Sequence, residues 1–128
     1  MGEHELERAG KIQGCACVFA AIAVILGAFG AHALEERLSE EALEWYHTAV
    51  EYHFIHALAL WFAGGAVRVG KSGLPSAVCF ATGITVFCGS LYALALTGQT
   101  WLGAVTPVGG VAFILGWSLL ALAMFRRR

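Results

Sequence analysis

Charged side chains are scarce along this chain. Asp, Glu, Lys and Arg make up 13% of its 128 residues, whereas an average soluble domain has about 25%. The chain therefore lacks the charge that a fully water-exposed surface needs. Hydrophobic residues make up 59% and gather in long runs, with the polar residues clustered between them. This composition indicates a single-domain, polytopic membrane protein and disfavours a soluble bundle.

Several signals of known chemistry are also missing. The net charge is −1 and the one basic run lies at the C-terminus, so no nucleic-acid partner is expected. Neither a phosphate-binding loop nor a nucleophile–base pair is visible, and no cofactor is predicted. Cys15 and Cys17 would lie about 200° apart around a helix, and Cys79 and Cys88 about 180° apart. Neither pair could form a disulfide or bind one metal, so the cysteines are expected to be apolar fillers.

Four apolar runs are each long enough to cross a bilayer, which takes about 20 helical residues. They cover about 12–34, 48–67, 74–97 and 106–125. Each run is apolar around its whole circumference, which is typical of membrane helices. We therefore predict an all-α fold, an integral membrane four-helix bundle that embeds the whole chain in the cell (inner) membrane.

The basic residues near the ends of these runs predict their orientation. With four spans, both termini and the middle loop share one side. That side carries seven of the eight Lys and Arg residues, namely Arg8, Lys11, Arg68, Lys71, Arg126, Arg127 and Arg128. Only Arg37 lies on the other side, so both termini are predicted to be cytoplasmic.

A cleaved signal peptide ending near Ala31-His32-Ala33 is an alternative interpretation of the first run. The leading segment has mixed charge, and the run exceeds the 7–15 apolar residues of a signal-peptide core. Both features favour a membrane span.

The helix ends carry recognisable signals. Ser39 is a suitable N-cap for an amphipathic, extracytoplasmic segment at about 39–47. Because no Gly or Pro follows until Gly64-Gly65, one helix is expected to begin in water, enter the membrane and end there. Thr106-Pro107 is expected to be the N-cap and first residue of the fourth helix.

Small residues recur every four positions on the third run, at Ala81, Thr85, Gly89, Ala93 and Thr97. This spacing allows membrane helices to approach closely. Packing within the bundle is the expected use, and a homo-oligomer interface is the alternative. Gly109, Gly110 and Gly116 provide a similar face on the fourth run.

Several polar residues interrupt the apolar runs, where polar groups are costly. From a rise of 1.5 Å per residue, His53 lies about 7–8 Å and His56 about 12 Å inside the second span. The polar residues of the other spans lie in the same, outer half of the membrane. We therefore predict a polar pocket there, made by His32, His53, His56, Ser90, Tyr92 and Thr106.

Helical geometry separates Glu51 from the two histidines of its own span. Glu51 lies about 200° from His53 and 140° from His56, but only about 40° from His47. A metal site made by Glu51, His53 and His56 is therefore disfavoured, and no metal is predicted. His47 and Glu51 are instead expected to form a weaker pair at the surface.

Three roles stay open for the polar pocket. Its histidines could make hydrogen bonds between helices, or form a small-molecule, lipid or proton-linked site open to the outer leaflet. Imidazole also suits a metal or haem, but no ligand set of the right spacing is complete.

Four segments carry a family resemblance: GAFGAHAL, TAVEYHFIHALAL, GSLYALALTG and TPVGGVAFILGW. In this order they resemble the small membrane proteins catalogued as domain of unknown function 423, the YgdD-like inner-membrane proteins. The resemblance covers about residues 27–120 and implies a four-helix membrane protein of unassigned activity. The residues that match the family pattern are His32, Tyr52, His53, His56, Ser90, Tyr92, Thr106 and Pro107, whereas Glu51 and Cys88 depart from it.

The sequence thus predicts a non-enzymatic membrane protein that acts through lipid or protein partners. Anionic lipid is a candidate partner for Arg126, Arg127 and Arg128. The first alternative is a transporter or small-molecule binder with an outer-facing pocket, which would need an oligomer because four helices are few for transport. The second alternative is an intramembrane metal or haem protein.

Overall fold

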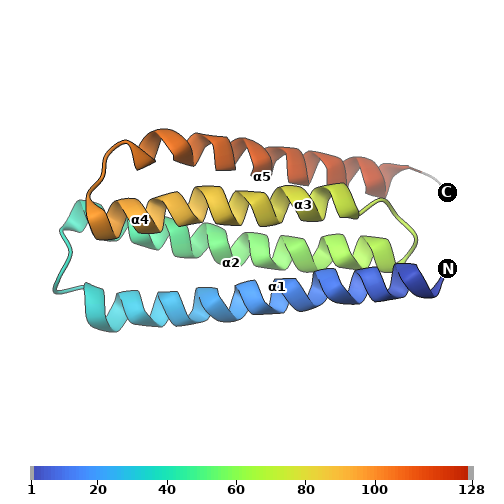
Figure 1. Ribbon diagram of the computed structural model, residues 1–128, viewed down its shortest axis with the longest axis horizontal. Helices are drawn as coiled ribbons and strands as arrows, with labels where there is room; N and C mark the ends of the chain where they lie inside the picture. Colours follow the sequence, from blue (N-terminus) through green and yellow to red (C-terminus); the bar gives the residue numbers. More distant parts are fainter. Residues whose placement is uncertain (1, 127–128) are drawn as a thin grey trace.

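The computed structural model describes residues 2–126. Within that range the chain is all-α and forms four long helical rods side by side (Figure 1). The first and third rods each contain one turn of π-helix. In chain order the rods are α1 (Glu3–Phe29) with η1 (Gly30–Leu34), α2 (Glu40–Arg68), α3 (Leu74–Gly83) with η2 (Ile84–Cys88) and α4 (Gly89–Thr97), and α5 (Leu102–Phe125).

The rods run up and down, so the connections alternate between two ends. Both termini and the α2–α3 loop lie at one end, the terminal end, and the other two connections lie at the far end (Figure 1). Three rods are long and apolar enough to cross a membrane, namely Glu3–Leu34, Leu74–Thr97 and Leu102–Phe125. The 29 residues of α2 span about 43 Å, but polar residues interrupt its apolar run.

The central rod is α2, which packs against each of the other three. Small side chains such as Ala49, Ala59 and Ala63 are fully buried along it and let the neighbours approach. Large apolar side chains point outward instead, including Ile25 on α1 and Ile114 on α5, both about two-thirds exposed. An apolar surface of this extent marks contact with a membrane or a partner.

Local signals define both ends of α2. The Ser39 hydroxyl accepts a hydrogen bond from the Ala42 N–H at 3.2 Å, which confirms the predicted N-cap. The predicted end at Gly64-Gly65 was wrong, because α2 continues to Arg68. A Cβ at Gly64 would meet the Gln13 side chain at 2.7 Å, so this glycine serves the close approach of α1.

The predicted start of the fourth helix was also wrong. Instead of beginning at Thr106-Pro107, α5 begins at Leu102 and contains Pro107 in its second turn. The preceding turn at Gly98 has a φ of +69°, which ends α4 and favours glycine. The chain therefore reverses direction within four residues, and α5 begins before the proline.

Glycines on α5 allow a close contact with the third rod. A Cβ at Gly109 would overlap the backbone of Phe87 in η2, and one at Gly116 would lie 2.7 Å from the Phe80 ring. Both glycines are buried, as predicted for a close-packing face. The π-helical turn of η2 thus packs its own backbone against α5.

The ladder of small residues on the third rod does not pack inside the bundle as predicted. Thr85, Gly89 and Thr97 are exposed, and Ala81 and Ala93 are half-buried. The Thr85 and Thr97 hydroxyls donate to carbonyls one turn earlier, at 2.9 and 2.6 Å, and so need no partner helix. The face that packs consists of larger apolar residues, namely Phe80, Ile84, Cys88, Leu91 and Leu94.

Candidate functional site

His53 lies on the side of α2 that faces α1 and α4. Its side chain is 3% exposed, and its Nδ1 lies 3.0 Å from the Tyr92 hydroxyl on α4. The Phe19 ring of α1 packs edge-on against the imidazole, with centroids 6.1 Å apart. Among residues 2–126, Nε2 has no hydrogen-bond partner. His53 is thus held in a closed core by one hydrogen bond.

Tyr46 extends this polar core toward the far end. It is buried, and its hydroxyl donates to the Leu26 carbonyl of α1 at 2.5 Å. A Cβ at Gly30 would overlap its ring, which explains the small residue there. The ring also packs edge-on against Tyr92, with centroids 5.3 Å apart. The hydroxyl thus acts as a donor that ties α2 to α1.

His56 lies on a different side of α2 and faces α5. Its Nδ1 lies 2.7 Å from the Tyr52 carbonyl, which can only accept, so Nδ1 carries the proton. Its Nε2 accepts a hydrogen bond from the Trp117 indole N–H at 3.1 Å. This arrangement requires the neutral imidazole, because a proton on Nε2 would face the indole N–H. Both ring nitrogens are therefore satisfied.

Aromatic rings surround His56. The Phe113 ring stacks on the imidazole with centroids 3.5 Å apart and planes 13° apart. Tyr52 is also nearly parallel to it at 5.7 Å, and Phe80 and Trp117 approach at about 6 Å. The histidine thus belongs to an aromatic cluster that joins α2, α3 and α5.

Ser90 and Thr106 form a third polar pair. Their hydroxyl oxygens lie 2.6 Å apart and link α4 to α5. Each also contacts a carbonyl of its own helix, Ser90 that of Phe87 at 3.0 Å and Thr106 that of Leu102 at 3.3 Å. Within residues 2–126, this pair makes no hydrogen bond to either histidine.

The predicted pocket residues therefore do not share one site. His53 pairs with Tyr92, Ser90 with Thr106, and His56 with Trp117. His32 is exposed in η1 and stands apart. Within residues 2–126, no three His, Cys, Asp or Glu side chains gather closely enough to hold a metal.

The predicted surface pair does not form an ion pair. His47 and Glu51 are both exposed, and within the described part of the chain the one ion pair joins Lys11 to Glu7 at 2.7 Å. Glu51 instead lines a groove that also contains His56.

Two grooves follow the seam between α2 and α5, and Trp117 lines both of them. We call them together the α2–α5 groove. Its far part, of about 460 Å³, is lined by Glu51, Tyr52, Ile55, His56, Phe87, Gly110, Phe113, Ile114 and Trp117. Its terminal part, of about 430 Å³, is lined by Phe62, Gly65, Ala66, Val69, Trp117, Leu120 and Met124. The polar side chains lie in the far part, whereas the terminal part is apolar.

Sequence reasoning missed Trp117 and the groove that it lines. A buried indole N–H normally has a hydrogen-bond partner, so a tryptophan within an apolar run was a usable signal. The predicted pocket contained only ionisable and hydroxyl side chains. Tyr46 was also not among the predicted pocket residues.

Most of this chain is similar in sequence to known proteins. The family described as "Protein of unknown function (DUF423)" matches residues 26–110. The UPF0382 membrane protein YwdK of Bacillus subtilis is 44% identical over 108 residues, which is 81% of this chain and 87% of that protein. The UPF0382 inner membrane protein YgdD of Escherichia coli is 40% identical over 115 residues, 85% of this chain and 88% of that protein. No solved structure matches the chain.

The family match contains all the residues of the predicted pocket. It ends before Trp117 and therefore covers the far part of the α2–α5 groove better than its terminal part.

Proposed function

Because the chain belongs to the DUF423 (UPF0382) family of membrane proteins, it works in a lipid bilayer, and we propose that it holds one amphiphilic molecule in the α2–α5 groove. In this proposal all four rods cross the membrane and both termini are cytoplasmic, as the positive-inside rule predicts. The far end then lies in the outer leaflet, and no chemical step is required of the protein.

The observation that carries the proposal is the polarity of the groove along its length. From Glu51 to Val69 the groove follows about 27 Å of α2, close to the hydrocarbon thickness of about 30 Å. Its far part contains a carboxylate and its terminal part is apolar. This order of polar and apolar lining matches an amphiphile whose head lies at Glu51 and whose chain passes Trp117.

The chemistry of the far part favours a head group that donates hydrogen bonds. The Glu51 carboxylate can only accept, and an ammonium group would give it charge-assisted hydrogen bonds. Tyr52 and Phe87 lie beside it in the lining, with ring centroids 4.7 Å apart, and aromatic faces attract cations. We therefore expect a lipid or other amphiphile with a primary amine. Since Glu51 departs from the family pattern, this preference would be a property of this chain.

The His56–Trp117 pair supports the passage of an apolar chain. Each polar atom of the pair is already hydrogen-bonded, either to its partner or to the Tyr52 carbonyl. An acyl chain can therefore lie against these rings without leaving an unpaired polar atom in an apolar environment, which would be costly. The histidine thus has a structural role in the wall of the groove.

Native mass spectrometry of the full chain, released from membranes in a mild detergent, tests the proposal. Phosphatidylethanolamine is the probe, and N-acetylated phosphatidylethanolamine is the matched lipid without a basic amine. We expect the amine lipid to bind about tenfold more tightly, since a charge-assisted hydrogen bond is worth about 1.5–3 kcal/mol. Equal binding of the two lipids would contradict the amine preference.

Two variants locate the bound lipid. E51Q should remove the preference for the amine, whereas E44Q, which removes an exposed carboxylate of the same helix, should retain it. G110L fills the groove at a lining position with only ordinary contacts nearby and should lower the binding of both lipids. Full binding to G110L would place the lipid elsewhere and overturn the proposal.

Self-association is a second candidate, because Thr85, Gly89 and Thr97 are exposed. A second copy packed there would provide the additional helices that transport requires. The same mass spectra report the stoichiometry. A dimer that G89L converts to a monomer would support this candidate, and a monomer under all conditions would exclude it.

A further inference from the structure

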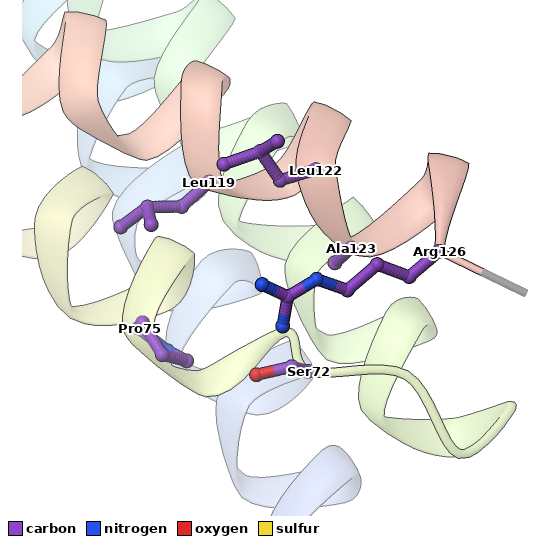
Figure 2. A pocket seen from close by; sticks show the side chains of 6 residues that line it. All are labelled: Ser72, Pro75, Leu119, Leu122, Ala123 and Arg126. Atoms are coloured by element: carbon purple, nitrogen blue, oxygen red, sulfur yellow. The ribbon is translucent and has the colours of Figure 1, made fainter. Parts of the chain in front are cut away.

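A small cavity lies at the terminal end, between the last turn of α5 and the start of α3 (Figure 2). Its volume is about 70 Å³. It shares no residue with the α2–α5 groove and lies on another side of α5. The lining residues are Ser72, Pro75, Leu119, Leu122, Ala123 and Arg126.

The charged group of this cavity is Arg126. Figure 2 shows its guanidinium extending from α5 toward the α2–α3 loop, over the Ser72 hydroxyl. No acidic residue lines the cavity, and the one ion pair within residues 2–126 lies elsewhere, at Lys11 and Glu7. Within residues 2–126, the guanidinium therefore faces the cavity without a carboxylate to neutralise it.

Lys71 adds a second cation and positions the first. Its Nζ donates a hydrogen bond to the Arg126 carbonyl at 2.6 Å, which ties the end of α5 to the α2–α3 loop. The loop thereby holds Ser72 and Arg126 on the same cavity. Leu119 and Leu122 form its apolar side, and Leu122 lies on the exposed surface of α5.

We propose that this cavity binds the phosphate of an anionic membrane lipid. The guanidinium is planar and can donate two parallel hydrogen bonds to phosphate oxygens, and the Ser72 hydroxyl can donate a third. Leu119 and Leu122 then contact the first carbons of the acyl chains. A lipid fits better than free phosphate because the cation and the apolar side chains line one cavity. Basic residues just outside a span attract anionic lipids in the same way.

The site differs from the proposed function in place, residues and lipid class. The groove takes an amine-bearing head at the far end, whereas this cavity takes an anionic phosphate at the terminal end. Each proposal can therefore fail alone, since one is measured with the amine lipid and E51Q and the other with an anionic lipid and R126Q.

The test measures lipid affinity of the full chain in detergent by native mass spectrometry. The probes are phosphatidylglycerol, phosphatidylcholine and inorganic phosphate. We expect phosphatidylglycerol to bind more tightly than phosphatidylcholine and inorganic phosphate to compete only weakly. R126Q should weaken phosphatidylglycerol about tenfold, because it removes charge-assisted hydrogen bonds to the phosphate. Adding K71Q should weaken it further, because Lys71 positions the end of α5.

Two controls distinguish a specific binding site from general electrostatic attraction of the lipid to basic residues. R128Q removes the same charge two residues further along the chain and should change the affinity less than twofold. S72A changes no charge and should weaken phosphatidylglycerol severalfold through the lost hydroxyl. Equal effects of R126Q and R128Q would overturn the proposal in favour of unspecific charge, and equal affinity for inorganic phosphate would overturn the lipid as ligand.

Discussion

His53 and His56 lie one turn apart on the same helix and are equally buried, at 3% and 4% exposed, yet their surroundings differ. His53 faces α1 and α4 in a closed core, with one hydrogen bond to Tyr92 and a second nitrogen without a partner in the described chain. His56 faces α5 with both nitrogens hydrogen-bonded, and it lines a groove. Burial alone therefore does not distinguish the two histidines.

The difference lies in how tightly the neighbouring helix packs. On the His53 side, Tyr46 and Tyr92 fill the space between α1, α2 and α4. On the His56 side, α5 packs closely on α3 and η2 through its glycines and leaves its contact with α2 incomplete. Aromatic rings line the remaining space, so of the two sides of α2 only the His56 side is expected to take a ligand.

The largest expected effect comes from disturbing the close contact between η2 and α5, which shapes the His56 side. Gly109→Ala would place a Cβ on the Phe87 backbone, which cannot rotate away as a side chain can. We expect the free energy of unfolding in mixed micelles to fall by about 3 kcal/mol, the upper range for overpacking.

Gly110→Ala is the matched control for this substitution. Its Cβ would lie 3.7 Å from the Phe87 ring, an ordinary contact, and its effect should stay within about 0.5 kcal/mol. Equal losses in the two variants would show that the close approach of η2 to α5 does not shape this side.

A smaller effect is expected on the His53 side. Tyr92→Phe keeps the ring but removes the hydroxyl, so His53 would lose its one hydrogen-bond partner in a closed core. We expect a loss of about 1–2 kcal/mol in the free energy of unfolding, near the maximum for one hydrogen bond between membrane helices. Tyr52→Phe is the control, because the Tyr52 hydroxyl makes no hydrogen bond within residues 2–126 and its ring is partly exposed. Equal stability of Tyr92→Phe and the unmodified chain would mean that His53 finds another partner.

Much of the architecture could be predicted from the sequence, because it depends on local or one-dimensional signals. Long apolar runs indicated the rods, and Ser39 indicated the start of α2. Depth counting placed His53, Tyr92, Ser90 and Thr106 in the same half of the bundle, but it did not predict that His53 pairs with Tyr92 and Ser90 with Thr106. These inferences needed only helical rise and periodicity.

The other features depend on which face each rod turns toward its neighbours. The depth of a residue in the membrane does not determine that face. The π-helical turns of η1 and η2 insert residues into the helical repeat and shift the faces beyond them. A ladder spaced by four residues, such as Thr85 to Gly89, therefore could not be assigned to the bundle interior. His56 was grouped with His53 because they lie about 60° apart, but that angle suffices to face a different helix.

Trp117→Phe tests the His56 side by removing the hydrogen bond between Trp117 and His56. A smaller aromatic ring replaces the indole, and His56 loses the donor to Nε2 while keeping its bond to the Tyr52 carbonyl. We expect a loss of about 0.6 kcal/mol in the free energy of unfolding, the average for hydrogen bonds between membrane helices. Trp61→Phe, at an exposed tryptophan of α2, is the control and should have no effect. A loss as large as that of Tyr92→Phe would show that the His56 side is as closed as the His53 side.

The smallest effects are expected at the histidines outside both pairs. His32 and His47 are exposed, so His32→Gln and His47→Gln remove no buried contact and should change the free energy of unfolding by less than about 0.5 kcal/mol. His53→Gln, measured beside them, should be clearly destabilising because glutamine cannot reproduce the ring packing against Phe19 and Tyr92. If His32→Gln instead cost as much as His53→Gln, His32 would belong to the buried polar set. The six predicted pocket residues would then act as one cluster, and the division of α2 into a closed side and a grooved side would be wrong.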